Sequence, residues 1–509
     1  MTADPYVQCG DERRSLAEVK YRASQLATGL HNAGVGAGDR VVLYLRNETT
    51  FLELCLATAM IGAAPVPVNW HWSGDDLEHV LRDSKATVAV GHTDLMPALE
   101  ARTPDEITLV EVEVPEAVRR WYGLDNAPTT GRSVNLSDWY RLEPWTEPAP
   151  SAPMSVIYTS GTTGRAKGVL RDPIAPDLRA TTLRNIADLY HLKPGETAIV
   201  PAPLYHSAPN VYATFAAALG MSLIIMPRFD AEEFLRLVDG HHANTAHLVP
   251  TMFRRLLRLP KSTRSSFDTD SLHSVVTAGA PCSPELKESM IEWLGAIVYE
   301  YYGGSEVGAW TACDSEEALK RPGTVGKPIL DADIRILDDE KNPVPVGKDG
   351  VVYGKNFTGW PDFTYIGDPD KRRRMEVDGY LTLGDIGHQD EDGYLYLSDR
   401  LNDMVVSGGV NIYPAEIEAC ISRLSRVADV AVFGIPDPDM GEALACYVQP
   451  VPGAQLDENE IREHVSSHLA RYKVPRKVVF VDELPREDTG KLFKRKLKQK
   501  YWENSETNT

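Results

Sequence analysis

Residues 158–170 read YTSGTTGRAKGVL. An apolar, β-prone run at 155–158 leads into four hydroxyl side chains and three glycines. Glycine lets the backbone turn tightly and present its N–H groups, and Arg165 and Lys167 add two cations. A loop of this kind after a strand suits a polyphosphate. It is not a Walker A loop, because Lys167 is followed by glycine. The alternative is a flexible linker, but linkers seldom continue into paired cations and an apolar strand.

Length and charge narrow the class of protein. A chain of 509 residues is too long for one ordinary core, so two or more domains are expected. The hydrophobic content of 43% and charged content of 25% fit a globular protein. The net charge of -20 argues against a general nucleic-acid-binding surface, although a local cationic pocket can still bind phosphate.

The six cysteines lie far apart, and their spacing indicates neither a C-x-x-C motif nor a metal site. No stretch approaches 18 consecutive apolar residues, and the N-terminus MTADPYVQCGDERR has no signal-peptide core. A cytoplasmic enzyme with reduced thiols, and with no integral membrane segment, is therefore expected.

The N-terminal part alternates between helix and strand patterns. Residues 15–38 carry an apolar helical stripe, 39–45 read as a strand, and 51–62 as a second helix before the apolar run 63–68. Strand, helix and strand joined by glycine turns indicate a parallel α/β sheet. By contrast, the proline-containing stretch 101–150 is expected to be an exposed connection.

A second group of site candidates occupies residues 299–306, YEYYGGSE. Tyr302 can stack on a flat ring, Ser305 can donate a hydrogen bond, and Glu306 can hold a hard cation such as Mg²⁺. The alternative is a surface glutamate beside a turn. Before this group, a strand breaks at Ala278-Gly279-Ala280-Pro281, which taken alone reads as a plain strand-to-helix turn.

These motifs, in this order, resemble those of the adenylate-forming superfamily, which includes acyl-CoA synthetases, aryl-CoA ligases, luciferases and peptide-synthetase adenylation domains. The resemblance covers nearly the whole chain. It includes SGGVNIYP at 407–414, typical of the CoA-ligase and luciferase branch, and LPREDTGK at 484–491. The chain departs from the family pattern at Ala166, where proline is usual, and at Asn402, where aspartate or lysine is usual.

The resemblance implies roles for individual residues. Catalysis is assigned to three side chains: Lys491, His206 and Glu306, the last also as the magnesium ligand. His206 would orient the substrate carboxylate, although a histidine at a strand end is more often structural. ATP binding is assigned to Thr159, Ser160, Gly161, Thr162, Thr163, Gly164, Lys167, Gly279, Ala280, Tyr302, Ser305, Asp385 and Arg400. CoA binding is assigned to Ser407, Gly408 and Gly409.

The implied fold is α/β, with a large N-terminal domain of stacked α/β sheets plus a β-subdomain, and a small mobile α+β C-terminal domain. The expected domains are 1–400 and 403–509, joined by a hinge at 401–402 that contains Asn402. Asparagine tolerates unusual backbone angles, so rotation about it is expected to present Lys491 for one step and the 407–412 loop for the next. The basic run 494–498 is expected to be a solvated face.

The implied reaction uses ATP, Mg²⁺ and CoA: a carboxylate forms an acyl-adenylate, and the CoA thiolate then displaces AMP. The pocket residues expected near 206–214, 277–280 and 301–308 are mostly small, aromatic or apolar, which favours a hydrophobic or aryl acid. One alternative is an amide synthetase that transfers the acyl group to an amine, and another is a non-catalytic nucleotide-binding protein. Either a monomer or a homodimer is compatible with the sequence.

Overall fold

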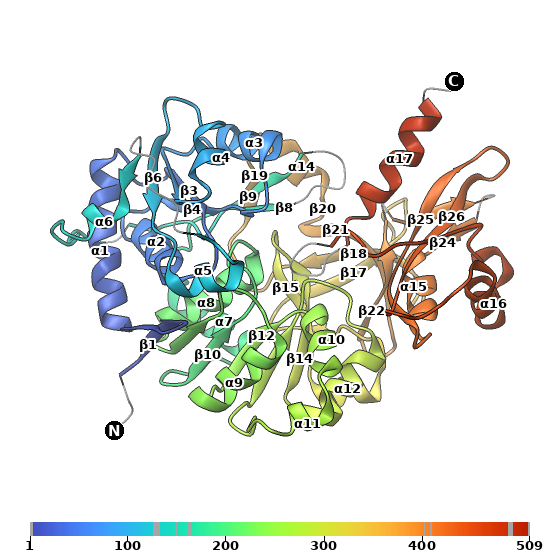
Figure 1. Cartoon of the computed structure of the whole chain (residues 1–509). Helices are drawn as coiled ribbons and strands as arrows, with labels where there is room; N and C mark the ends of the chain where they lie inside the picture. The colour runs from blue at the N-terminus through green and yellow to red at the C-terminus, as the bar shows by residue number, and fades with distance from the viewer. Residues whose placement is uncertain are drawn as a thin grey trace. The chain divides into compact units, whose positions relative to one another are not determined.

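The computed structural model describes residues 4–125, 133–148, 150–159, 165–401, 403–407, 410–486 and 492–506. The chain divides into two compact units (Figure 1). The first contains 1–320, 328–333 and 356–376, and the second contains 321–327, 334–355 and 377–509. Both mix helices with sheets, which confirms the predicted α/β class. The second unit takes in strands on both sides of residue 402, so the hinge at 401–402 stays a prediction.

The first unit is built on two large sheets. The nine-stranded sheet has the order β16-β15-β14-β13-β12-β10-β11-β1-β2, and the five-stranded sheet has the order β4-β3-β5-β6-β7. The strands of the larger sheet are β1 Tyr6–Cys9, β2 Glu12–Ser15, β10 Thr197–Val200, β11 Ser222–Ile225, β12 Thr245–Leu248, β13 Ser274–Thr277, β14 Val298–Gly304, β15 Gly308–Cys313 and β16 Lys327–Pro328. The strands of the smaller sheet are β3 Arg40–Tyr44, β4 Ala64–Pro67, β5 Val88–His92, β6 Thr108–Val112 and β7 Val134–Asn135.

Alternating side chains explain how these sheets are covered on both faces. In β10, Ala198 and Val200 join one hydrophobic cluster, whereas Ile199 points into another. The first cluster is shared with the smaller sheet and with α1, α2 and α8, so these helices lie between the two sheets. Helices α9, α10 and α12 cover the other face of the larger sheet, and α3 and α4 cover the other face of the smaller one. Five layers alternate between helix and sheet.

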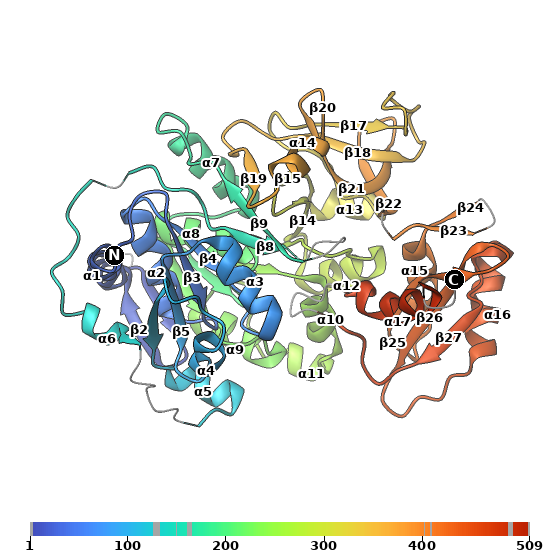
Figure 2. The ribbon, with the colours of Figure 1, turned by 90° about the horizontal axis from the view of Figure 1, so that it is seen from above.

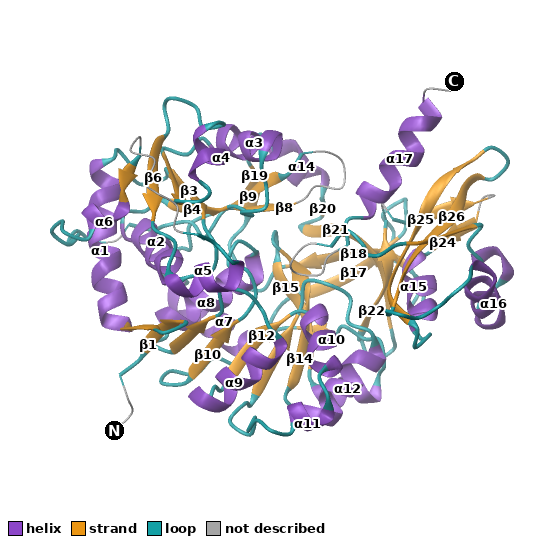
Figure 3. Cartoon of the chain, in the orientation of Figure 1, coloured by secondary structure: helices purple, strands orange, loops and turns teal. Residues whose placement is uncertain are grey.

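Most helices of this unit follow a strand in the chain, and Figure 3 colours the helices purple and the strands orange. Their bounds are α1 Leu16–Asn32, α2 Thr49–Met60, α3 Gly74–Ser84, α4 Met96–Glu100, α5 Glu116–Tyr122, α6 Leu136–Trp139, α7 Arg179–Tyr190, α8 Ser207–Ala218, α9 Ala231–His241, α10 Pro250–Arg258, α11 Lys261–Arg264, α12 Pro284–Leu294, α13 Ser315–Lys320 and α14 Pro369–Arg374. A small third sheet has the order β19-β9-β8, from β8 Ile157–Thr159, β9 Lys167–Arg171 and β19 Phe363–Tyr365.

The second unit contains two five-stranded sheets. One has the order β17-β18-β21-β20 with β22 paired to β21, and the other has the order β24-β23-β26-β25 with β27 paired to β26. The strands are β17 Asp333–Leu337, β18 Gly350–Lys355, β20 Glu376–Val377, β21 Tyr380–Gln389, β22 Leu395–Arg400, β23 Val405–Ser407, β24 Val410–Ile412, β25 Val427–Asp437, β26 Gly441–Pro450 and β27 Lys477–Phe480.

Helices α15 Pro414–Ser422 and α16 Glu458–His468 pack on one face of the sheet that contains β25–β27 (Figure 2). A 3₁₀ turn, η1 Arg471–Lys473, and helix α17 Lys494–Glu506 complete this unit. Apolar residues of α15 and α16, Ile417 and Ile461 among them, are fully buried against this sheet. The two helices are therefore joined through a common core.

Two expectations from the sequence are wrong. Residues 101–150 are not only an exposed connection, because β6 lies inside the parallel sheet with Val110 fully buried. The basic run 494–498 is not only a solvated face: Leu497 is buried, and Lys494 pairs with Glu418 at 2.9 Å. Three nearby carboxylates oppose the effect of burial and raise the pKa of Lys494.

None of the helices in the described part of the chain combines the length and the apolar character that a membrane crossing needs.

Candidate active site

The strands on either side of the hydroxyl-rich loop form a β-hairpin. β8 and β9 pair antiparallel, so Thr159 lies directly opposite Lys167 where the two strands meet the loop. Residues Ser160–Gly164 of the predicted ATP-binding set lie outside the described residues, and their role stays a prediction. The loop is followed by a strand, so no helix begins directly after it to add the dipole of a helix N-terminus. The predicted phosphate binding would therefore depend on loop N–H groups, hydroxyls and nearby cations.

The third strand of the small sheet connects this hairpin to Glu306. β19 pairs with β9, placing Tyr365 opposite Val169. The Tyr365 hydroxyl donates a hydrogen bond of 2.7 Å to Glu306 Oε1. Burial and the Glu306 carboxylate both raise the pKa of Tyr365, so the hydroxyl keeps its proton and remains a donor. Tyr365 thus fixes one oxygen of the predicted magnesium ligand.

Arg171, at the end of β9, ties three parts of the site together. Its side chain is almost completely buried. Nη1 donates to the Ser155 carbonyl oxygen at 3.1 Å, and Nη2 donates to Ser207 Oγ at 3.0 Å and to the Ser305 carbonyl oxygen. Burial lowers the pKa of Arg171 to about 10, an effect that Glu306 partly opposes, so the guanidinium is charged at neutral pH. Arg171 was not predicted from the sequence, because its partners lie on distant segments.

Lys167, predicted to bind ATP, forms an ion pair with Asp368. Asp368 caps α14, and its side chain accepts a hydrogen bond of 3.0 Å from the Lys371 backbone N–H. The hydrogen bond from Lys167 is the largest cause that lowers the pKa of Asp368. Lys371 Nζ lies 3.9 Å from the centre of the Tyr365 ring. Two lysines therefore lie close to the Tyr365–Glu306 contact.

The edge of the large sheet gathers the other candidates of this unit. Strands β10, β12, β13 and β14 run parallel, so the segments that follow them meet at one edge, where α/β sheets bind ligands. His206 caps α8 after β10, and Gly279 follows β13 in a left-handed conformation, with a φ of 82°. Ala280 comes next, and Tyr302 is a buried residue of β14 that packs edge-on against Trp310.

The YGGSE turn itself requires a glycine. At Gly303 the pairing of β14 with β15 shifts register, and a Cβ there would lie 2.0 Å from the Gly308 carbonyl oxygen. Any larger residue would push the two strands apart. Gly303 therefore holds the turn that presents Ser305 and Glu306.

Two predicted nucleotide contacts belong to the second unit. Asp385 and Arg400 are cross-strand neighbours on β21 and β22, with Arg400 Nε 3.2 Å from Asp385 Oδ1. Ser407 ends β23, where it pairs with Val410 and Gly441. The predicted residues Asn402, Gly408, Gly409 and Lys491 lie outside the described residues. The ribose, hinge, CoA and catalytic-lysine roles all stay predictions.

A buried polar cluster lies on the α8-facing side of the same parallel strands. We call it the tyrosine–histidine cluster: Tyr190, Tyr212, His247 and Tyr301. His247 has ring centroids of the three tyrosines within 5.7 to 6.3 Å. The Tyr190 and Tyr301 hydroxyls are 3.0 Å apart. Neither ring nitrogen of His247 has a hydrogen-bond partner in another described residue, and burial lowers the pKa of His247 to about 4. A neutral imidazole is thus buried without the partners that such a group normally has.

The comparisons with known proteins agree with this geometry. A family model described as "AMP-binding enzyme" matches residues 3–356, and one described as "AMP-binding enzyme C-terminal domain" matches residues 416–491. The chain is 30% identical to a long-chain-fatty-acid–CoA ligase of Mycobacterium tuberculosis over 495 residues, covering 96% of this chain and 94% of the relative. It is 31% identical to a feruloyl-CoA synthase of Amycolatopsis sp. over 502 residues, covering 97% and 95%.

A solved structure extends the likeness to the fold. The ATP-bound crystal structure of MatB from Rhodopseudomonas palustris superimposes with a TM-score of 0.83 and 27% identity, covering 98% of this chain and 96% of that one. The two family models together span both the hairpin and site-bearing strands and most of the C-terminal segment. The chain therefore belongs to the AMP-binding enzyme family of adenylate-forming enzymes.

Proposed function

We propose that this protein is an acyl- or aryl-CoA ligase that forms AMP and pyrophosphate. In the first step, a carboxylate oxygen of the acid attacks the α-phosphorus of ATP, and the bond to the bridging oxygen of pyrophosphate breaks. In the second, the CoA thiolate attacks the acyl carbon and AMP leaves, giving a thioester. The observation that carries this proposal is Glu306 held by Tyr365 beside the Arg171-anchored YGGSE turn, in a chain whose CoA-ligase relatives align over nearly its full length.

Charge placement supports this chemistry. The reaction needs no nucleophile on the enzyme, because the acid is already ionised at neutral pH. It needs cations against the triphosphate, which positioning and preorganised charge can supply. Lys167 and the 159–164 loop are assigned to the β- and γ-phosphates, and Arg171 holds the Ser305 carbonyl so that the turn keeps its shape. His206 is assigned to the substrate carboxylate, and Gly279, Ala280 and Tyr302 to the adenine.

The residues present also fit the magnesium ion that the family implies. Glu306 offers a carboxylate, the ligand type that Mg²⁺ prefers, and one of its oxygens is already oriented by Tyr365. Bound there, Mg²⁺ would offset negative charge on the phosphates.

Residues of the C-terminal segment are assigned to different steps of the reaction. Lys491 is proposed to contact the substrate carboxylate during adenylation, and Ser407, Gly408 and Gly409 to line the path of the pantetheine arm. These groups belong to one small domain, so we propose that rotation about Asn402 presents them in turn. Asp385 is assigned to the ribose hydroxyls and Arg400 to ribose or phosphate.

The tyrosine–histidine cluster narrows the class of acid. Its residues lie on strands β12 and β14, two of the parallel strands of the large sheet, and on helices α7 and α8. Three of its four rings are tyrosines, which would suit a hydrophobic or aryl acid that reached them. The ring nitrogens of His247, which have no hydrogen-bond partner in another described residue, would favour an acid whose far end carries one polar group, such as a phenolic hydroxyl.

Pyrophosphate release tests the proposal. The purified protein is given ATP, Mg²⁺ and each of a panel of plain and hydroxylated aryl and fatty acids, first alone and then with CoA. We expect acid-dependent release, faster for hydroxylated than for plain aryl acids, and thioester when CoA is added. Amide from an added amine, without thioester from CoA, would favour an amide synthetase. No acid-dependent release with any panel member would leave only nucleotide binding.

A further inference from the structure

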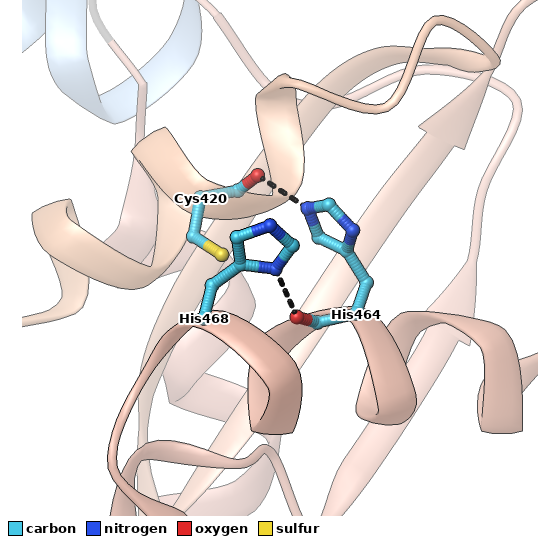
Figure 4. A group of neighbouring side chains, drawn as sticks. All are labelled: Cys420, His464 and His468. Atoms are coloured by element: carbon cyan, nitrogen blue, oxygen red, sulfur yellow. Dashed lines mark hydrogen bonds between the residues drawn. The ribbon is translucent and has the colours of Figure 1, made fainter.

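The second unit brings together three metal-ligating side chains that the proposed ligase reaction does not use. Cys420 lies on α15, and His464 and His468 lie one turn apart on α16 (Figure 4). One ligand atom from each side chain lies within 4.8 Å of the other two. In the described part of the chain, this is the one group of three or more His, Cys, Asp or Glu side chains close enough to hold a metal ion. Cysteine spacing gave no sign of it, because the other two ligands are histidines on another helix.

Hydrogen bonds set the orientation of both imidazole rings. His468 Nδ1 lies 2.8 Å from the His464 carbonyl oxygen, so Nδ1 carries the proton and Nε2 keeps its lone pair. Metal-binding histidines usually have such a partner on the second nitrogen. His464 Nε2 lies 3.0 Å from the Cys420 carbonyl oxygen, beside the cluster. Figure 4 shows the two rings next to each other with the Cys420 sulfur on the far side of His468. For His464 to ligate through Nε2, its proton moves to Nδ1 and the ring turns away from the carbonyl.

The burial of the three residues grades from the core to the surface. Cys420 is buried with 4% of its surface exposed, His464 is half-buried, and His468 is exposed. A cation here would therefore contact the protein on one side and water on the other. Burial raises the pKa of the Cys420 thiol; of the nearby charged groups, Arg423 lowers this pKa and Glu416 raises it. On metal binding the thiol loses its proton to solvent, and the thiolate becomes the ligand.

The donor set selects the class of metal. One thiolate and two imidazoles suit Zn²⁺ and other borderline or soft ions, whereas Mg²⁺ and Ca²⁺ require oxygen ligands. Three protein ligands leave a fourth tetrahedral position for water. We propose that Cys420, His464 and His468 form a Zn²⁺ site that links α15 to α16. This site is distinct in chemistry from the Glu306 site, which offers an oxygen ligand to a hard cation.

Linking the helices would stabilise the unit that contains them. α15 and α16 already share a core, and a common ion adds a second connection at its solvent edge. An ion that binds the folded form more tightly than the unfolded form raises the thermal midpoint in proportion to the logarithm of its concentration above Kd.

Metal titration of the full-length protein tests the site. After treatment with a chelator and buffer exchange, Zn²⁺ is added and binding is followed by calorimetry, while Co²⁺ serves as a spectroscopic probe of thiolate ligation. We expect one tight Zn²⁺ per chain, a rise in the thermal midpoint, and a near-ultraviolet thiolate-to-cobalt band. Cys420→Ser should abolish the band and weaken Zn²⁺ binding by at least about 10-fold, and His468→Gln should weaken binding similarly.

Matched controls separate this site from adventitious binding. Cys282→Ser removes a thiol outside the cluster, and His31→Gln removes an exposed histidine on α1. Both should bind Zn²⁺ and Co²⁺ as the wild type does. Circular dichroism of each metal-free variant checks that it is folded. No thiolate band in the wild type, or Zn²⁺ binding that Cys420→Ser leaves unchanged, would mean surface chelation only and would overturn the proposal. The readouts are metal binding and stability, so they do not depend on ligase activity.

Discussion

Removing the Tyr365 hydroxyl should weaken Mg²⁺ binding at Glu306, so that adenylation needs a higher Mg²⁺ concentration. Tyr365→Phe deletes one oxygen from a side chain with 2% of its surface exposed, and so deletes the 2.7 Å hydrogen bond to Glu306. A hydrogen bond to a charged group is worth about 1.5–3 kcal/mol, which is about 10- to 150-fold. Losing the partner of a metal-binding carboxylate typically costs about 10- to 100-fold in metal affinity. We expect the Mg²⁺ concentration for half-maximal activity to rise by about 10- to 100-fold.

Acid-dependent ATP–pyrophosphate exchange, measured over a series of Mg²⁺ concentrations, follows this effect. Tyr44→Phe is the matched control, because Tyr44 is equally buried and donates a 2.6 Å hydrogen bond, but to the Trp72 carbonyl oxygen. The control should keep the wild-type Mg²⁺ dependence. If Tyr365→Phe also keeps it, then Glu306 does not act through magnesium in the way proposed here.

Three further substitutions test the roles of Lys491, Arg171 and His247. Lys491→Ala should lower the rate of adenylate formation by about 100- to 1,000-fold but spare thioester formation from supplied acyl-adenylate. Equal losses in both half-reactions would count against the proposed role of Lys491. Arg171→Lys cannot reproduce the forked hydrogen bonds and should cost about 3 kcal/mol, seen as a lower thermal midpoint; an unchanged midpoint would contradict this. His247 has a folded pKa of about 4, below the unfolded value of about 6.5, so the unfolded chain binds the proton first and stability falls as pH drops between these values. His247→Phe should remove a loss of about 2 kcal/mol between pH 7 and pH 5, measured by urea unfolding; an equal pH dependence in both proteins would refute it.

The features predicted correctly from the sequence are those that short local patterns of residues encode. The strand pattern at 39–45 and the apolar run at 63–68 predicted two neighbouring strands, and the structure has β3 and β4 there. The hydroxyl-rich loop predicted to bind ATP is flanked by the two strands of a β-hairpin. The stretch 101–150 was misjudged because its prolines flank, but do not interrupt, the buried strand Thr108–Val112. Proline signals a chain turn nearby, not an exposed segment.

What the sequence could not supply were contacts between distant segments. Arg171 reads as an ordinary basic residue at a strand end, and only the folded chain brings Ser155, Ser207 and Ser305 around it. Tyr365 lies 59 positions from Glu306 in the chain, with no local pattern that connects the two. Burial of His247 likewise depends on three tyrosines from three other elements.

Transfer of an oxygen atom from the acid to AMP shows whether the acid is activated as an adenylate. An accepted acid labelled with ¹⁸O in both carboxylate oxygens is turned over with ATP and CoA, and the products are weighed by mass spectrometry. If the carboxylate attacks the α-phosphorus, each AMP molecule carries one ¹⁸O and pyrophosphate carries none. Label in inorganic phosphate or pyrophosphate, or AMP without label, would show that the acid is not activated as an adenylate.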